Sequence, residues 1–450
     1  MPSSSTSGAS VREIAGRLME RDHWTPERLA AHQRERLDGL VRHAAARSPY
    51  YRGVLGPAAA RANGVRLRDL PTLPKATLME HFDEIVTDVR VRRGSAGADP
   101  AGSRLVGGHR VFATSGSTGR PGVIVYSEAE FAVWTASHLR MMAAMGVTSA
   151  MRAVGIGAPS PAHLSRQMLA DAAAGRSGAA PDLSVATPMP DMVAALNDYR
   201  PDAISTFPST AALLAEEQLA GRLRIAPAVV AVGAEVLTDD MRRRIREAWD
   251  IEPHQAYLAG EAPLIASTLT GRPDMRLWED LLLVEVVDAD DRPVAPGVPG
   301  HKVLITNLVN HVQPLIRYEL TDMVTWSPGP AGQPFRVLSS IEGRNDDIIT
   351  LPTSGGGEIA IPPVLLRAPF TTFPEVKQFQ VTYDGDELSG RIVLRTGSPP
   401  DTPARVRTAL TRELRKTGAT PPPITIVPVP EIPREGGPAA KYKLIKNNPR

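Results

Sequence analysis

The sequence predicts an α/β protein with two unequal domains: a large, layered N-terminal domain and a small, mobile α+β domain at the C-terminus. A chain of 450 residues is too long for one ordinary hydrophobic core, which favours one large and one smaller domain. Between residues 181 and 250, apolar β-branched segments alternate with helix-like segments. This alternation is typical of a parallel sheet covered by helices. Beyond residue 281 strands and turns dominate, which predicts a β-rich subdomain.

The domain boundaries follow from these changes of pattern. We expect a disordered tail at residues 1–10, the large domain at 11–342 and the small lid domain at 343–450. The tail lacks the basic-then-apolar order of a secretory signal, and no apolar run reaches membrane-spanning length. The sequence therefore predicts a cytoplasmic protein.

Composition favours a small-molecule partner. A formal net charge of only +2 provides no global field that would draw the protein to nucleic acid or to a membrane. The chain contains no cysteine, which excludes disulfides, thiolate metal sites and a cysteine nucleophile. The sequence leaves the oligomeric state open.

The first third of the chain predicts helices followed by two short strands. Leucines recur at helical spacing among charged residues from 26 to 46, and residues 76–82 open another helix. The apolar runs 111–113 and 123–126 indicate strands. Ser127 and Glu130 have the spacing of a capping box, in which each side chain satisfies a backbone N–H of the first turn, so a helix should begin there.

The same patterns continue to the C-terminus. In the layered part, strands are expected at 203–205 and 228–232, and helices at 211–219 and 239–249. The β-rich part should contain strands 281–287 and 302–306. The small domain should contain strands 347–351, 378–382, 391–394 and 424–429, with a helix at 402–416.

A loop rich in serine, threonine and glycine lies between the two short strands, at Thr114-Ser-Gly-Ser-Thr-Gly-Arg-Pro-Gly122. Its hydroxyl groups, its backbone N–H groups freed by glycine's permissive dihedrals, and its one cation suit the wrapping of an oligophosphate. A flexible linker has a similar composition, but Pro121 would stiffen it. The loop lacks the Gly-Lys-Ser/Thr of a Walker A motif. The predicted phosphate-binding residues are Thr114, Ser115, Gly116, Ser117, Thr118 and Gly119.

Several residues after the loop indicate a functional site only when they are considered together. Glu261 follows an inferred strand, and ligands of α/β sheets gather beyond the carboxyl ends of strands, where an acid could hold Mg²⁺. Asp322 could bind ribose hydroxyls, or it could be a turn residue or an ion-pair partner of Arg317. Lys441 and Lys443 lie in a C-terminal segment where lysines are usually solvated.

The order of these motifs resembles the adenylate-forming superfamily of acyl-CoA synthetases, peptide-synthetase adenylation domains and luciferases. After the Ser/Thr/Gly loop come Tyr257-x-x-x-Glu261, Tyr318-x-x-x-Asp322, Gly343-Arg344-x-Asp346-Asp347 and a C-terminal lysine. The resemblance runs from about residue 48 to residue 446. The segments Ser48-Pro-Tyr-Tyr-Arg52, Pro314-Leu-Ile-Arg-Tyr318 and Val376-Lys-Gln-Phe-Gln380 resemble the phenylacetate-CoA-ligase-like branch.

The resemblance implies a role for each motif. The Ser/Thr/Gly loop would grip the β- and γ-phosphates of ATP, Glu261 would ligate Mg²⁺, and Lys441 would reach the α-phosphate during adenylation. Asp346 would be the hinge about which the small domain rotates between half-reactions. The nucleotide contacts would be Gly233, Ala234, Glu235 and Tyr257 at adenine, and Asp322 and Arg344 at ribose. The expected walls of the substrate pocket are Phe207, Pro208, Gly260 and Ala262.

Three departures from the family pattern bear on function. Gly260 replaces the usual threonine or serine before the motif glutamate, which removes a hydroxyl from the substrate side. Ala440 replaces the glycine before the lysine, which leaves Lys443 as an alternative adenylation lysine. A structural zinc site is not expected, because the chain has no cysteine.

Three functions stay open at this point. The first is an AMP-forming ligase that activates a carboxylic acid, aromatic by resemblance, as acyl-AMP with release of pyrophosphate and passes it to CoA or another nucleophile. The second, favoured by Gly260, is a diazotase of secondary metabolism that adenylates nitrite and transfers it to an aryl amine. The third is a catalytically degenerate, nucleotide-binding regulatory protein. ATP or AMP and Mg²⁺ are the expected cofactors, with CoA as one possible acceptor.

Overall fold

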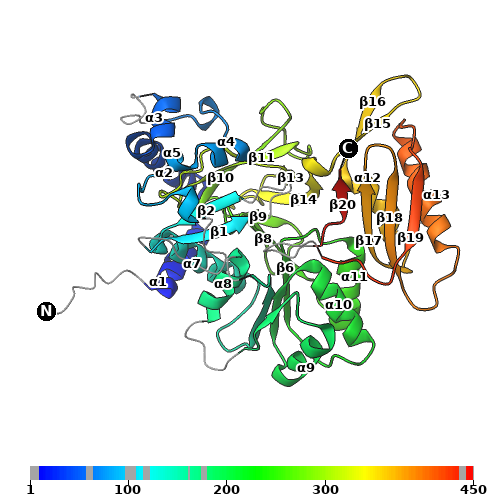
Figure 1. Cartoon of the computed structure of the whole chain (residues 1–450). Coiled ribbons are helices and arrows are strands. Elements are labelled where there is room, and N and C mark those ends of the chain that lie inside the picture. The colour runs from blue at the N-terminus through cyan, green and yellow to red at the C-terminus, as the bar shows by residue number, and fades with distance from the viewer. Residues whose placement is uncertain are drawn as a thin grey trace.

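The computed structural model describes residues 10–56, 64–96, 108–114, 122–160, 163–173, 180–434 and 442–448. N-terminal helices and a large sheet form most of the molecule, and the C-terminal strands and helices stand together at one side (Figure 1). This arrangement confirms the predicted α/β class with a smaller C-terminal unit. None of the described helices has both the length and the apolar composition needed to cross a membrane.

The N-terminal helices pack against the body of the large unit. The first begins after Ser10, which forms a capping box with Glu13. The second matches the predicted helix of residues 26–46 to within one residue. The predicted tail up to residue 9 lies outside the described residues. The helices are α1 (Val11–Glu20), α2 (Pro26–Arg47), α3 (Pro49–Leu55), α4 (Lys75–Glu80), α5 (Phe82–Ile85) and α6 (Arg93–Ala96).

Two strands flank the Ser/Thr/Gly loop, as the sequence predicts. Strand β1 (Arg110–Thr114) pairs antiparallel with β2 (Gly122–Tyr126). The next helix, α7 (Glu128–Ala144), begins with the predicted capping box between Ser127 and Glu130. This confirms that the loop joins two strands and leads into no helix of its own.

The large sheet has nine strands in the order β13-β14-β9-β8-β7-β6-β5-β3-β4. Strands β3 to β7 run parallel, and the others join antiparallel. Both faces of the parallel part are covered, because Val230 and Val232 of β6 pack in one hydrophobic cluster while Val229 and Ala231 pack in another. The strands of the parallel part are β3 (Ala153–Gly157), β4 (Leu183–Ser184), β5 (Ala203–Thr206), β6 (Val229–Gly233) and β7 (His254–Tyr257). The helices between them are α8 (Leu164–Ala173), α9 (Met189–Tyr199), α10 (Pro208–Leu219) and α11 (Asp239–Trp249).

The predicted β-rich subdomain is only partly separate. Strands β10 (Leu282–Val287), β11 (Lys302–Asn307) and β12 (Tyr318–Leu320) form a three-stranded sheet of their own. Strands β13 (Asp322–Ser327) and β14 (Val337–Arg344) instead extend the large sheet, through β9 (Met275–Leu277) and β8 (Ala266–Thr268). This pairing joins residues about sixty positions apart, and a local pattern of strands and turns carries no information about such a partner.

The C-terminal unit has its own sheet and core. Strands β17 (Val376–Tyr383) and β18 (Leu388–Leu394) form a hairpin, flanked by β19 (Ile424–Pro428) and β20 (Ile445–Asn447). Helices α12 (Pro363–Thr371) and α13 (Thr402–Lys416) pack against it, and a small hairpin of β15 (Ile349–Pro352) and β16 (Glu358–Ile361) precedes them. The helix α13 has the predicted bounds. The proposed domain boundary at 342/343 falls within β14 and stays a prediction.

Candidate functional site

The candidate site begins at one edge of the large sheet, where neighbouring parallel strands end. Strands β5, β6 and β7 lie side by side and end at Thr206, Gly233 and Tyr257. The predicted pocket residue Phe207, the segment from Ala234 and the segment that leads to Glu261 therefore leave the sheet at the same edge. Ligands of open α/β sheets bind at this edge.

The backbone at the end of β6 requires a small residue. A Cβ atom on Gly233 would lie 2.7 Å from the carbonyl oxygen of Ala256 on the neighbouring strand. The next residue, Ala234, has a φ of +68°, which is an uncommon conformation for a residue with a side chain. The chain thus turns sharply at the predicted adenine cradle.

Glu261 is a buried carboxylate held by aromatic hydroxyls. Its side chain accepts a hydrogen bond from the Tyr318 hydroxyl at 2.9 Å (Oη to Oε1). Its backbone oxygen accepts from the Tyr126 hydroxyl at 2.9 Å and from Asn307 Nδ2 at 2.8 Å. Burial, reinforced by the Glu261 carboxylate, raises the pKa of Tyr318 well above its usual range, so this hydroxyl keeps its proton and donates. A buried carboxylate at this sheet edge suits an oxygen ligand for a divalent cation.

The two predicted ribose residues lie together. Asp322 Oδ2 accepts a hydrogen bond of 2.7 Å from the Tyr257 hydroxyl, and Asp322 Oδ1 lies 3.4 Å from Arg344 Nε. The alternative that Asp322 pairs with Arg317 is wrong, because Arg317 forms its ion pair with Glu285 at 3.0 Å. Tyr257, Asp322 and Arg344 thus form one polar group beside the end of β7.

Lys75 is a cation of this site that sequence reasoning missed. The chain before it adds to the edge of β12, because the Leu73 amide donates to the Arg317 oxygen at 2.9 Å and the Leu73 oxygen accepts from the Glu319 amide at 3.1 Å. Burial lowers the pKa of Lys75, while the nearby Glu261 carboxylate opposes that shift. The interaction places the ammonium group near Glu261. The local sequence, a leucine–proline loop, gave no signal of this.

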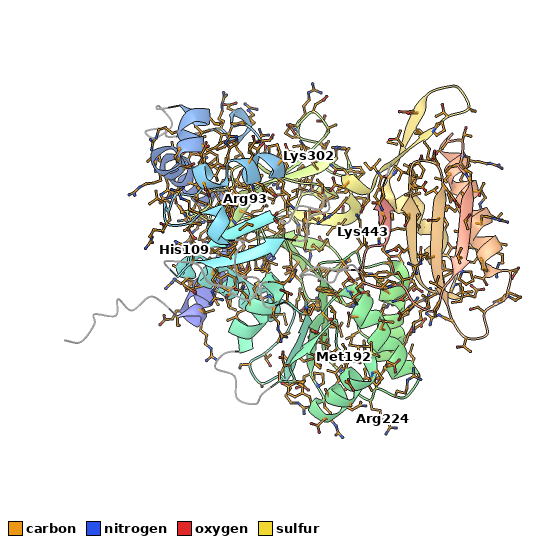
Figure 2. All side chains as sticks on the ribbon, viewed as in Figure 1. Arg93, His109, Met192, Arg224, Lys302 and Lys443 are labelled. Atoms are coloured by element: carbon orange, nitrogen blue, oxygen red, sulfur yellow. The ribbon has the colours of Figure 1, made fainter. Side chains whose placement is uncertain are left out.

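The predicted hinge is connected to both parts of the chain. Asp346 accepts a hydrogen bond of 3.0 Å from the Thr321 hydroxyl, and the Asn345 amide donates to the Thr321 oxygen at 2.7 Å. Its neighbour Asp347 pairs with Lys443 at 3.4 Å. Lys443 lies at the junction of the two units (Figure 2).

Some predicted site residues lie outside the part of the chain that the structure describes. These are the phosphate-loop residues Ser115, Gly116, Ser117, Thr118 and Gly119, and the predicted adenylation lysine Lys441. Thr114 and Gly122 are described, and they pair with each other at the end of the β1–β2 hairpin. No group of three or more acidic or histidine side chains that could hold a metal occurs among the described residues.

The known proteins that this chain resembles are CoA ligases. A phenylacetate-coenzyme A ligase from Thermus thermophilus is 29% identical over 373 residues, which cover 78% of this chain and 77% of that protein. A phenylacetate-coenzyme A ligase from Escherichia coli is 27% identical over 444 residues, 94% of this chain and 96% of that protein. A solved structure of 2-hydroxyisobutyryl-CoA ligase matches with a TM-score of 0.74 and 21% identity over 95% of this chain and 91% of that one. No family model matches the chain.

The chain belongs to the superfamily of adenylate-forming acyl-CoA ligases. Its members are AMP-forming ligases. The arrangement of the two units resembles one state of the structural neighbour: the TM-score is 0.74 for the postadenylation state and 0.59 for the thioesterification state.

The predicted substrate-pocket residues lie on two segments that follow strands β5 and β7 at the same edge of the sheet. Phe207 is buried and precedes Pro208, the first residue of α10. Gly260 accepts a hydrogen bond from Tyr126 at 3.0 Å through its carbonyl oxygen, and Ala262 is fully buried. Gly260 and Ala262 thus flank Glu261 on the side lined by Tyr126 and Asn307.

Proposed function

We propose that the protein is an ATP-dependent ligase that activates an aromatic carboxylic acid as acyl-AMP, releases pyrophosphate, and transfers the acyl group to CoA. The observation that carries the proposal is the position of the Glu261 carboxylate. Tyr318 anchors one of its oxygens, and the Tyr257–Asp322–Arg344 group lies at the end of the same strand. These are the groups needed to hold a metal–phosphate and a ribose at one sheet edge.

The chemistry of adenylation explains the charges of the site. An anionic carboxylate must approach the α-phosphate of ATP, which is itself anionic, so positive charge is needed where the new bond forms. Mg²⁺ at Glu261 would supply a Lewis acid that neutralises the phosphate oxygens. Lys75 and Lys441 would supply further positive charge, and Asp322 would fix the ribose through its hydroxyls.

The aromatic acid and CoA are inferred from the relatives. The curated relatives are named for phenylacetate and coenzyme A. A structural neighbour of 15% identity is an anthranilate CoA ligase solved with anthranoyl-AMP. The buried Phe207 and the small residues Gly260 and Ala262 are compatible with a flat aromatic substrate.

Nitrite is the second candidate oxyanion, and Gly260 favours it. The family hydroxyl at this position would lie on the carboxylate side of the substrate, and here that side carries only a glycine whose carbonyl faces Tyr126. Transfer of the activated nitrite to an aryl amine would follow.

We assign the adenylation role to Lys441 rather than to Lys443. Lys443 is held by Asp347, next to the hinge, at 3.4 Å. Tyr442, the neighbour of Lys441 in the chain, donates its backbone N–H to Glu235 at 2.8 Å. That contact holds the chain neighbour of Lys441 beside the predicted nucleotide site.

The proposal is tested with the purified protein, ATP and Mg²⁺. Aryl carboxylic acids and nitrite are supplied one at a time, and release of AMP and pyrophosphate is measured with and without CoA or an aminoaryl acid. Thioester formation with an aryl acid supports the ligase. AMP release that requires nitrite and an aryl amine would replace it with the diazotase.

A further inference from the structure

The contact between the large and the small unit is polar, in contrast to the interior of each. Each hydrophobic cluster of the described residues belongs to one unit, with none spanning both. Away from the hinge, helices α10 and α11 and the segment after β6 of the large unit contact the small unit. Contacts of this kind, without a shared apolar core, are typical of domains that move relative to each other.

The first anchor of this contact is Glu216 on α10. Its carboxylate accepts from Lys377 Nζ at 2.6 Å and from Arg395 Nη1 at 2.9 Å, and both cations belong to the small unit. Arg244 on α11 completes the group with an ion pair to Glu216 at 2.8 Å. Arg244 also donates to the backbone oxygens of Val376 and Lys377 at 3.2 and 3.0 Å.

The second anchor is Glu235, beside the predicted adenine cradle. Its Oε1 accepts from Arg434 Nη1 at 3.1 Å and from the Tyr442 backbone N–H at 2.8 Å. Arg434 also donates to the hydroxyls of Ser209 and Thr210, at 2.9 and 2.8 Å. The Glu235 side chain is only 5% exposed, so this carboxylate is shielded from water and paired across the contact.

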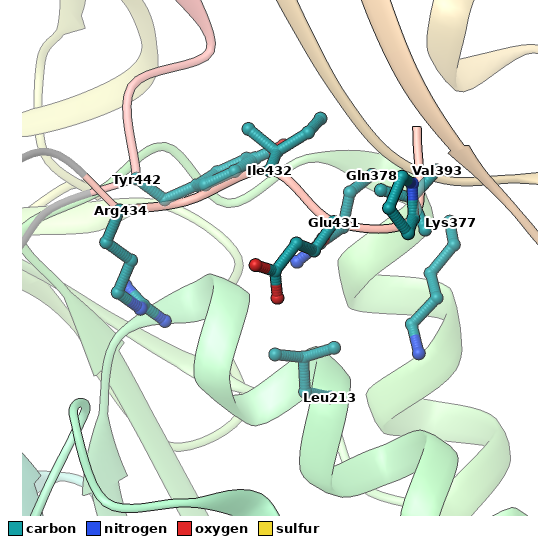
Figure 3. Close-up of a pocket in the computed structure, with 9 residues that line it drawn as sticks. Leu213, Lys377, Gln378, Val393, Glu431, Ile432, Arg434 and Tyr442 are labelled. Atoms are coloured by element: carbon teal, nitrogen blue, oxygen red, sulfur yellow. The ribbon is translucent and has the colours of Figure 1, made fainter. Parts of the chain in front are cut away.

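Cavities lie along the same contact. One of about 280 Å³ is lined by Leu213 of α10 and by residues of the small unit, and the Glu431 carboxylate points into it between Lys377 and Arg434 (Figure 3). A second, of about 250 Å³, lies beside Glu216 and Arg244. The two units are therefore not closely packed along this part of the contact.

We propose that these two anchors form a clasp that holds the small unit in the arrangement used for adenylation. The clasp comprises Glu216 with Arg244, Lys377 and Arg395, and Glu235 with Arg434 and Tyr442. This inference rests on the proposed two-step ligase. Arg434 and Tyr442 lie on either side of residues 435–441 in the chain, so their shared partner Glu235 positions the chain on both sides of Lys441. They are positioning residues for the first half-reaction, and the clasp must open for the second.

Domain arrangement is measured first, because it does not depend on turnover. Cysteines introduced by Arg224→Cys and Asp386→Cys, both exposed, take a fluorophore pair selectively since the chain has no other cysteine. Single-molecule energy transfer should show one dominant population in the otherwise unchanged protein. Arg434→Met combined with Glu216→Gln should populate a second arrangement. An unchanged distribution would overturn the clasp.

The matched control is Arg405→Met. Arg405 forms an ion pair of 3.2 Å with Glu375, and both residues belong to the small unit. This variant removes a paired guanidinium, 45% exposed against 20% for Arg434, without removing an ion pair between the units. Its energy-transfer distribution should equal that of the parent. A shift as large as in the clasp variant would mean that any lost charge disturbs the arrangement.

The rates of the two half-reactions, measured separately, then distinguish a loss of positioning from general damage to the enzyme. Arg434→Met should slow acid-dependent formation of acyl-AMP about 10- to 100-fold, as expected for loss of charge-assisted hydrogen bonds. Thioester formation from supplied phenylacetyl-AMP and CoA should be unchanged or faster. Equal losses in both steps would contradict a role specific to the first. If the parent forms no acyl-AMP, the proposed function fails, while the energy-transfer result still decides whether the clasp exists.

Discussion

Asp322→Asn tests the ribose assignment most sharply, because the substitution keeps the shape of the side chain and removes its charge. In the structure the carboxylate accepts a short hydrogen bond of 2.7 Å from Tyr257 and lies 3.4 Å from Arg344. Its side chain is 15% exposed. A hydrogen bond to a charged group in such a position contributes about 1.5–3 kcal/mol. We therefore expect the affinity for ATP to fall about 10- to 100-fold in the variant.

The assay compares ATP with 2′-deoxy-ATP and 3′-deoxy-ATP by calorimetry. The parent protein should bind at least one deoxynucleotide about 10-fold or more weakly than ATP, because the carboxylate is left without its hydroxyl partner. Asp322→Asn should reduce that discrimination to a few-fold. Tyr257→Phe is the control: it removes the donor to Asp322 but keeps the carboxylate, so discrimination should largely persist. Equal weakening of ATP and of both deoxynucleotides by Asp322→Asn would refute the assignment.

Three further predictions concern lysines of the candidate site and His138, a partly buried histidine. Lys75→Met should slow acyl-AMP formation about 10-fold or more. Burial lowers the pKa of Lys75, so the rate of the parent protein should decline with rising pH at a lower pH than an ordinary lysine would cause. Lys75→Arg should move that decline to higher pH. An unmoved profile would argue against the role of Lys75. Lys441→Ala should abolish pyrophosphate exchange while Lys443→Ala retains most of it, and the reverse result would transfer the role to Lys443. Burial lowers the pKa of His138 to about 4, so the unfolded state binds more protons between that value and about 6.5. Stability should be independent of this group above about pH 6.5 and fall toward pH 4 by at most about 3 kcal/mol. The melting temperature of His138→Gln should therefore fall less steeply with falling pH than that of the parent protein. An equally steep fall in both proteins would exclude His138 as its cause.

The elements that sequence reasoning predicted well are those specified by local chemistry. Ser127 and Glu130 lie three residues apart and cap the same turn, so the start of α7 is encoded within four residues. Apolar residues that recur at helical spacing in residues 402–416 likewise define α13. The order of the motifs around Glu261 and Asp322 then indicated the superfamily, which the relatives confirm.

The features that sequence reasoning missed depend on contacts between distant residues. Lys75 lies at the candidate site only because Leu73 pairs with the Arg317–Glu319 segment. Glu235, predicted as an adenine contact, pairs with Arg434, which lies 199 positions along the chain. An isolated lysine or glutamate in a loop is usually solvated, so neither residue could be distinguished before the fold brought its partners together.

The central claim, that the chain forms an adenylate at Glu261, is tested most directly by exchange of labelled pyrophosphate into ATP. The account predicts Mg²⁺-dependent exchange that requires an aryl carboxylic acid or nitrite and that falls at least about 100-fold in Glu261→Gln. Binding of ATP without any exchange, across a broad panel of acids and with nitrite, would contradict it. The protein would then be a nucleotide-binding member of the superfamily that does not turn over.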